Sequence, residues 1–164
     1  MAPPTHPFSL DAGRIRLGDV VFVYLERTFL PTAPLPPGNV PRAYGVAPLS
    51  VLEDGEAIAG IWPGEGVWLG FQPVDRSTPA VVRVRVEGEP EHRLVCPPDH
   101  ALPGRRSGAG YVPFSEGRLT ILTGDEDPAQ VTIRLVPARD FTDMTGMPIE
   151  PIDPSHAYQG HRLP

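Results

Sequence analysis

Hydrophobic and polar residues alternate with a period of two in several short stretches of the chain. In AVVRVRVEG, Val82, Val84 and Val86 are separated by charged residues, and VTIRLV and RLTILTG repeat the arrangement. Successive side chains of a β-strand point to opposite faces of a sheet. The alternation therefore predicts strands that bury one face and expose the other to solvent.

Runs of apolar and β-branched residues predict six further strands. They cover residues 14–17, 20–26, 43–52, 57–62, 67–72 and 92–96. The stretch IWPGEGVWLGF is typical of a β-hairpin with its turn at residues 63–66, and GDEDPAQ is expected to join two other strands. Helices are hard to place, because 23 prolines and 17 glycines interrupt the chain too often for three continuous helical turns.

About eight short, mostly antiparallel strands with Pro/Gly-rich loops predict an all-β fold, either a sandwich or a partly closed barrel. We expect an N-terminal extended segment at residues 1–13, a single β domain at 14–147 and a Pro-rich, extended C-terminal arm at 148–164. The arm carries apolar and aromatic residues that need burial, so we expect it to pack on its own domain. A free arm and an arm laid on a neighbouring subunit are the alternatives.

The charge of the chain argues against two classes of partner. The net charge is −6, and no run of basic residues is longer than the pair Arg105 and Arg106. Nucleic acids and anionic membranes attract clustered positive charge, so we expect neither as a partner.

All 14 basic residues are arginine, as in proteins of GC-rich bacteria. Without a signal-like start or an apolar run of about 20 residues, the sequence predicts a cytoplasmic protein.

The stretch HRLVCPPDH contains the only cysteine and two histidines. Imidazole and thiolate groups are zinc ligands, and His92, Cys96, Asp99 and His100 are all of suitable type. Strand geometry, however, separates residues i and i+4 by about 13 Å, which is too far for one metal ion. We therefore predict no metal, no cofactor and no catalytic residue here, but a strand that ends in a proline turn with Asp99 and His100 at its exposed tip.

Candidate binding residues are aromatic or paired basic side chains. Trp68 is expected to point away from Val67, Leu69 and Phe71, either into a second layer or onto the surface as a contact residue. Arginine pairs beside small residues can hold carboxylate or phosphate groups by bidentate hydrogen bonds. The predicted ligand- or partner-binding residues are Trp62, Trp68, Arg105, Arg106, Tyr111 and Tyr158.

These features favour a non-enzymatic β-sandwich module that acts through surface contacts and through its C-terminal arm. A protein partner or self-association is expected, because sheet edges and extended arms pair readily with other chains. One alternative is a small-ligand-binding β-barrel with the arginines and tryptophans at its mouth. The other is a metal-dependent or thiol hydrolase that uses His92, Cys96, Asp99 and His100.

Overall fold

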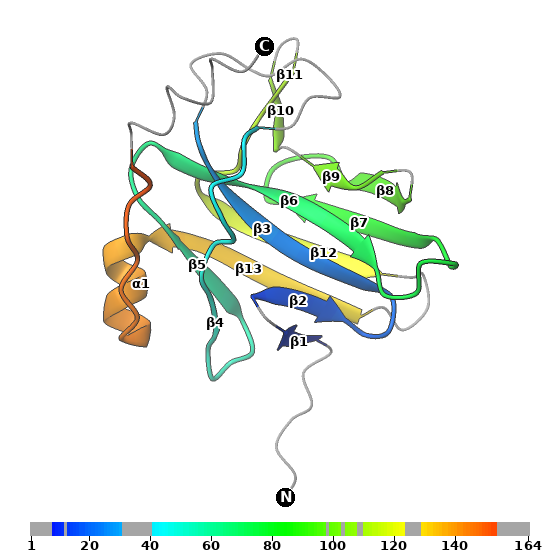
Figure 1. Ribbon diagram of the computed structural model, residues 1–164, viewed down its shortest axis with the longest axis horizontal. Helices are drawn as coiled ribbons and strands as arrows, with labels where there is room; N and C mark the ends of the chain where they lie inside the picture. The colour runs from blue at the N-terminus through cyan, green and yellow to red at the C-terminus, as the bar shows by residue number, and fades with distance from the viewer. Residues whose placement is uncertain are drawn as a thin grey trace, which may run out of the picture.

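Two β-sheets pack face to face and are not closed into a barrel (Figure 1). This is the architecture of the computed structural model, which describes residues 8–11, 13–30, 41–97, 99–102, 104–107, 110–123 and 129–153. The all-β sandwich predicted from the alternating pattern is thereby confirmed, and the partly closed barrel is not what the two sheets form.

The first sheet has five strands, each antiparallel to its neighbours. In spatial order they are β1 (Phe8–Asp11), β2 (Arg14–Leu17), β3 (Val21–Phe29), β6 (Glu65–Pro73) and β9 (Ala101–Leu102). The long pair β3 and β6 forms its centre. Strand β1 lies in the stretch for which the sequence shows no alternation.

The second sheet has six strands. In spatial order they are β4 (Leu49–Val51), β5 (Ala57–Ile61), β13 (Ala129–Pro137), β12 (Gly117–Thr123), β7 (Ala80–Val86) and β8 (His92–Cys96). Strands β5 and β13 are parallel, and the other neighbours are antiparallel. A separate two-stranded sheet joins β10 (Arg105–Ser107) to β11 (Gly110–Val112).

The core lies between the two large sheets and is formed by the inward-facing side chains of the strands of both sheets. Val82, Val84 and Val86 of β7 are buried, while Arg83 and Arg85 between them are not. This is the alternation from which the strand was predicted. Burial of such side chains stabilises the fold by about 1.5–3 kcal/mol each.

The predicted hairpin at IWPGEGVWLGF is wrong. Strand β5 belongs to the six-stranded sheet and β6 to the five-stranded sheet, so the chain crosses between the layers at residues 62–64. A tight turn does form there, because the amide of Glu65 donates to the carbonyl of Trp62 at 3.0 Å and Gly64 has a φ of 83°. A turn of this kind can join two strands of one sheet or two layers of a sandwich.

One helix, α1 (Ala138–Thr145), follows β13 and was not expected from the sequence. Pro137 precedes its first turn, and Gly146 ends it with a φ of 77° and an amide that donates to Thr142. Phe141 is fully buried, and with Ile149 it packs on Ile58 of β5. The helix and the segment after it therefore cover the outer face of the six-stranded sheet at β5 and β13 (Figure 1).

Candidate functional site

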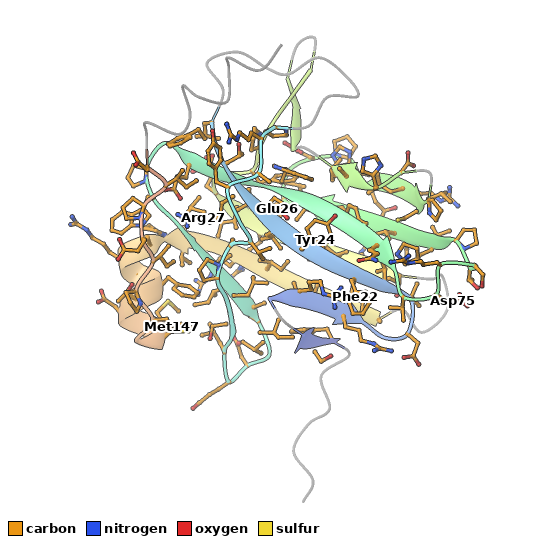
Figure 2. The ribbon with its side chains drawn as sticks, in the orientation of Figure 1. Phe22, Tyr24, Glu26, Arg27, Asp75 and Met147 are labelled. Carbon is orange, nitrogen blue, oxygen red and sulfur yellow. The ribbon has the colours of Figure 1, made fainter. Side chains whose placement is uncertain are left out.

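The outer face of the five-stranded sheet carries aromatic side chains. On β6, Val67, Leu69 and Phe71 point into the core and Trp68 points outward, half-buried, as the sequence predicts. On β3, Phe22, Tyr24 and Glu26 follow one another on the same outward side (Figure 2). Helix α1 contacts β5 and β13 of the other sheet, so it does not cover this face.

Glu26 lies at the centre of this face. It is directly opposite Trp68 of β6, and on its other side it forms a β-bridge with Val46. Tyr24 lies two residues away on the same strand. No described residue forms a hydrogen bond or an ion pair with the carboxylate of Glu26, and burial raises its pKa. We call Tyr24, Glu26, Val46 and Trp68 the Glu26 site.

The ring of Tyr24 lies directly over the backbone of Gly70. A Cβ atom added to Gly70 would overlap the Cε2 and Cζ atoms of that ring, so only glycine fits at this position. Burial is the largest cause that raises the pKa of Tyr24, followed by the negative charge of Glu26 and then by Cys96. The phenol of Tyr24 and the carboxylate of Glu26 are thus close enough to act on each other.

Three further polar groups of this face are the guanidinium groups of Arg14 and Arg16 on β2 and the indole N–H of Trp68. The guanidinium group of Arg14 lies 4.0 Å from the centre of the Phe22 ring, which is a cation–π contact. Arg16 forms an ion pair with Asp19 at 2.7 Å. The indole Nε1 of Trp68 is buried and has no hydrogen-bond partner among the described residues. The cations are therefore held at one edge of the face, away from the carboxylate at its centre.

On the outer face of the six-stranded sheet, acidic and basic side chains form ion pairs with one another. Glu56 forms ion pairs with Arg134 at 3.0 Å and with Arg118 at 3.4 Å. Arg85 forms an ion pair with Glu91 at 2.8 Å. The charges named here are mutually paired, whereas the carboxylate of Glu26 on the opposite face is not.

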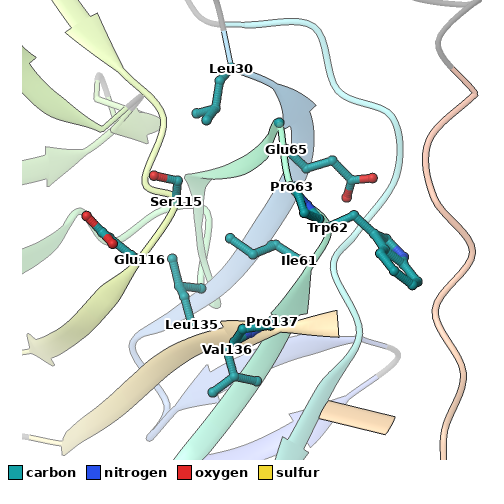
Figure 3. Close-up of a pocket in the computed structure, with 11 residues that line it drawn as sticks. Leu30, Ile61, Trp62, Pro63, Glu65, Ser115, Glu116, Leu135, Val136 and Pro137 are labelled. Atoms are coloured by element: carbon teal, nitrogen blue, oxygen red, sulfur yellow. The ribbon is translucent and has the colours of Figure 1, made fainter. Parts of the chain in front are cut away.

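A pocket of about 350 Å³ opens at one end of the sandwich. Figure 3 shows Leu30, Ile61 and Leu135 pointing toward one another across it, with Ser115 and Glu116 on one side. Trp62 also lines the pocket, and its indole N–H donates to the carbonyl of Ile149 at 2.8 Å. The volume is within the range of small-molecule pockets, and most of the wall is apolar.

A buried ion pair holds the C-terminal segment beside this pocket. The Nη2 atom of Arg27 donates to Oε1 of Glu65 at 2.8 Å and to the carbonyl of Glu150 at 2.8 Å. The other carboxylate oxygen of Glu65 accepts the amide of Ile152 at 3.0 Å. Together with the Trp62 bond, these contacts form what we call the C-terminal clamp. The described part of the predicted arm thus packs on its own domain, and the residues after 153 lie outside the described residues.

The structure does not gather the residues of HRLVCPPDH into a site. Cys96 ends β8, its thiol donates to the carbonyl of Phe71 at 3.5 Å, and burial, more than the nearby Asp99, raises its pKa. Asp99 accepts the amide of Val95 at 3.1 Å, and both Asp99 and His100 are exposed. No three His, Cys, Asp or Glu residues of the described chain could hold a metal ion together. The predicted strand with an exposed tip is what forms.

Of the six predicted binding residues, the structure describes the side chains of Trp62 and Trp68. Trp62 lies in the connection between β5 and β6 and lines the pocket, whereas Trp68 lies on the outward side of β6. Arg106 is opposite Tyr111 in the β10–β11 pair, next to Arg105, but their side chains are outside the described part, as is all of Tyr158.

The sequence analysis missed Tyr24 and Glu26, although one signal could have revealed them. In DVVFVYLERTFL, the positions that alternate with the buried Val21, Val23 and Leu25 are Phe22, Tyr24 and Glu26. Aromatic residues at positions where solvent-facing polar residues are usual indicate a contact surface.

Comparison with known proteins adds no family to this picture. Neither protein-family models nor curated proteins nor solved structures gave a match to the chain. The helix of the described residues is too short to cross a membrane.

Proposed function

We propose that the protein is a non-enzymatic interaction module that binds a protein partner through the outer face of the five-stranded sheet. The observation that carries the proposal is the carboxylate of Glu26, which is partly buried without a polar partner between Tyr24, Trp68 and Val46. A buried charge destabilises a protein unless a partner compensates it. A partner with apolar groups and a positive charge supplies that compensation.

The composition of the face supports the same role. Tyrosine and tryptophan are enriched at the centres of protein interfaces, where they bury large areas with little loss of side-chain entropy. Val46 adds an apolar side chain that is 40% exposed. With a net charge of −6, the module also attracts basic partners over distance.

A pair of photo-crosslinking variants tests this proposal. The crosslinking residue replaces Val46 in one variant and Met144 of α1 in the other, since both side chains are apolar and similarly exposed, at 40% and 46%. We expect a defined partner to crosslink in the producing cell from position 46 and not from position 144.

The identified partner is then purified and its affinity measured. Val46→Arg places a positive charge beside Glu26, which compensates the carboxylate and repels a basic partner, so binding should weaken about tenfold or more, while Met144→Arg leaves it unchanged. Equal crosslinking from both positions, or equal affinities of the two variants, would show that the sheet face is not the binding surface.

A second candidate function is small-molecule binding in the pocket at the end of the sandwich. Its support is the volume of about 350 Å³ between Leu30, Ile61 and Leu135. Trp62 lines this pocket, so an apolar ligand should change its fluorescence, and Leu135→Trp, which fills the space, should abolish the change. A screen in which no apolar compound alters the fluorescence of Trp62 would remove this candidate.

A further inference from the structure

We infer that the Glu26 site accepts the guanidinium group of an arginine side chain presented by the protein partner. The inference deepens the interaction role proposed above and depends on it. It concerns what fills the centre of the sheet face, where the chain provides a carboxylate between aromatic and aliphatic side chains.

The first step is geometric. Glu26 has Trp68 opposite it on β6, Val46 opposite it on the other side, and Tyr24 next along the same face of β3. Directly opposite residues of an antiparallel pair have Cβ atoms about 4.5–5.5 Å apart. The carboxylate is therefore surrounded by an indole, a phenol and an isopropyl group, and neither the indole N–H nor the phenol O–H forms a hydrogen bond with it among the described residues.

The second step is that the chain's own cations are used elsewhere. Arg27, the next residue along β3, turns to the C-terminal clamp and contacts Glu65 and Glu150 (Figure 2). Arg14 stacks on Phe22, and Arg16 pairs with Asp19. Among the described residues, none forms a hydrogen bond or an ion pair with Glu26, so its carboxylate is available to a cation of a partner.

The third step is the choice between cations. Guanidinium is planar, forms two parallel hydrogen bonds to a carboxylate and stacks on aromatic rings. It is also less strongly hydrated than an ammonium group, so its transfer to a partly apolar site costs less. Tyr24 and Trp68 offer the rings and Glu26 the carboxylate, which matches arginine better than lysine.

Short peptides test the inference with the full chain. The probes are N-acetylated, C-amidated Gly-Arg-Gly and its lysine and citrulline counterparts, of which the citrulline peptide has the same shape without the charge. The two indole N–H signals in ¹⁵N NMR spectra are the readout. Trp68 lies in the site, whereas Trp62 is bonded to Ile149 in the clamp and provides an internal control.

The arginine peptide should shift the Trp68 signal in a saturable way at millimolar concentration and leave the Trp62 signal in place. Glu26→Gln should weaken this binding about tenfold or more, because a charge-assisted hydrogen bond pair is lost. Glu53→Gln is the matched control, since Glu53 is an exposed carboxylate away from the site. This variant should bind the arginine peptide as the unmodified chain does.

Three results would overturn the inference. Equal shifts with the citrulline peptide would show that charge plays no part, and equal affinity of Glu26→Gln would exclude the carboxylate. Equal affinity for the lysine peptide would show a site for any cation rather than for arginine.

The peptide and crosslinking experiments fail independently. If a partner crosslinks from position 46 but the arginine peptide does not bind, the interaction role stands, and the inference that the partner presents an arginine to the Glu26 site is wrong. If the peptide binds but no partner depends on Val46, the interaction role is wrong. If crosslinking at position 46 yields a dimer of this chain, the occupant is a second copy, and the external partner is excluded.

Discussion

Glu26 and Tyr24 are two acids on one strand, and the negative charge of the first raises the pKa of the second. Both are partly removed from water, which favours their neutral forms. For Glu26 the folded-state pKa lies above the unfolded one, so its contribution to stability is present at low pH and is lost as pH rises through the folded pKa. At neutral pH the ionised side chain of Glu26 therefore opposes folding.

This coupling gives a prediction at the level of single residues. Glu26→Gln removes the negative charge beside Tyr24, so the pKa of Tyr24 should fall toward its ordinary value, although burial keeps it above that value. The ring signals of Tyr24 followed by NMR from pH 8 to pH 12 give the measurement. Glu53→Gln should leave the titration unchanged, and an unchanged Tyr24 titration in Glu26→Gln would show that the two groups do not interact.

Single residues also mark the limit of sequence interpretation. The outward direction of Trp68 follows from the alternation with Val67, Leu69 and Phe71, and it was predicted correctly. The lack of a partner for Glu26 depends on which strands flank it, and alternation carries no information about neighbours. The outward positions of Tyr24 and Glu26 could therefore be predicted from the alternation, whereas the unpaired state of the carboxylate could not.

At the level of elements, period-two patterning identified most strands. The strand at residues 92–96 has the predicted bounds, whereas the one expected at 43–52 shrinks to β4 at Leu49–Val51. The missed helix has a signal in the Pro137 and Gly146 that bound it, since proline suits the start of a helix and glycine its end. Two turns of helix are too short to produce a clear periodic pattern.

The packing of this helix gives the second prediction. Gly60 of β5 faces Ile149 and Phe141 so closely that a Cβ atom would overlap both side chains. Gly60→Ala should therefore destabilise the protein by about 1–3 kcal/mol in urea unfolding. The double variant with Ile149→Val, which removes a methyl group from the contact, should recover part of this loss. Strict additivity of the two substitutions would contradict the proposed contact.

At the scale of the whole molecule, the sandwich was predictable and its connections were not. Alternation states which residues face the core, but not which strand pairs with which. Ala57 of β5 pairs with Ile133 of β13, far along the sequence, and the turn at residues 62–64 leads into the other layer. Both features depend on long-range packing.

The third prediction concerns Glu65 of the C-terminal clamp, which connects β3 with the C-terminal segment. Glu65 is 3% exposed and accepts hydrogen bonds from both Arg27 and Ile152. Glu65→Gln leaves the buried guanidinium without its counter-charge, so we expect a loss of about 3 kcal/mol and a Tm lower by roughly 10 °C. Glu53→Gln should change the Tm by less than about 2 °C. A Glu65→Gln Tm within that margin would show that the ion pair contributes little.

The parallel pairing of β5 with β13 also sets an order of events during synthesis. When β5 leaves the ribosome, its neighbour β4 has already been translated, but β13, which will lie on its other side, has not. β3 and β6 can pair before β13 has been translated, so the centre of the five-stranded sheet can form before the six-stranded sheet is complete. In arrested nascent chains, β5 should stay accessible to proteases and chaperones until residue 137 has emerged.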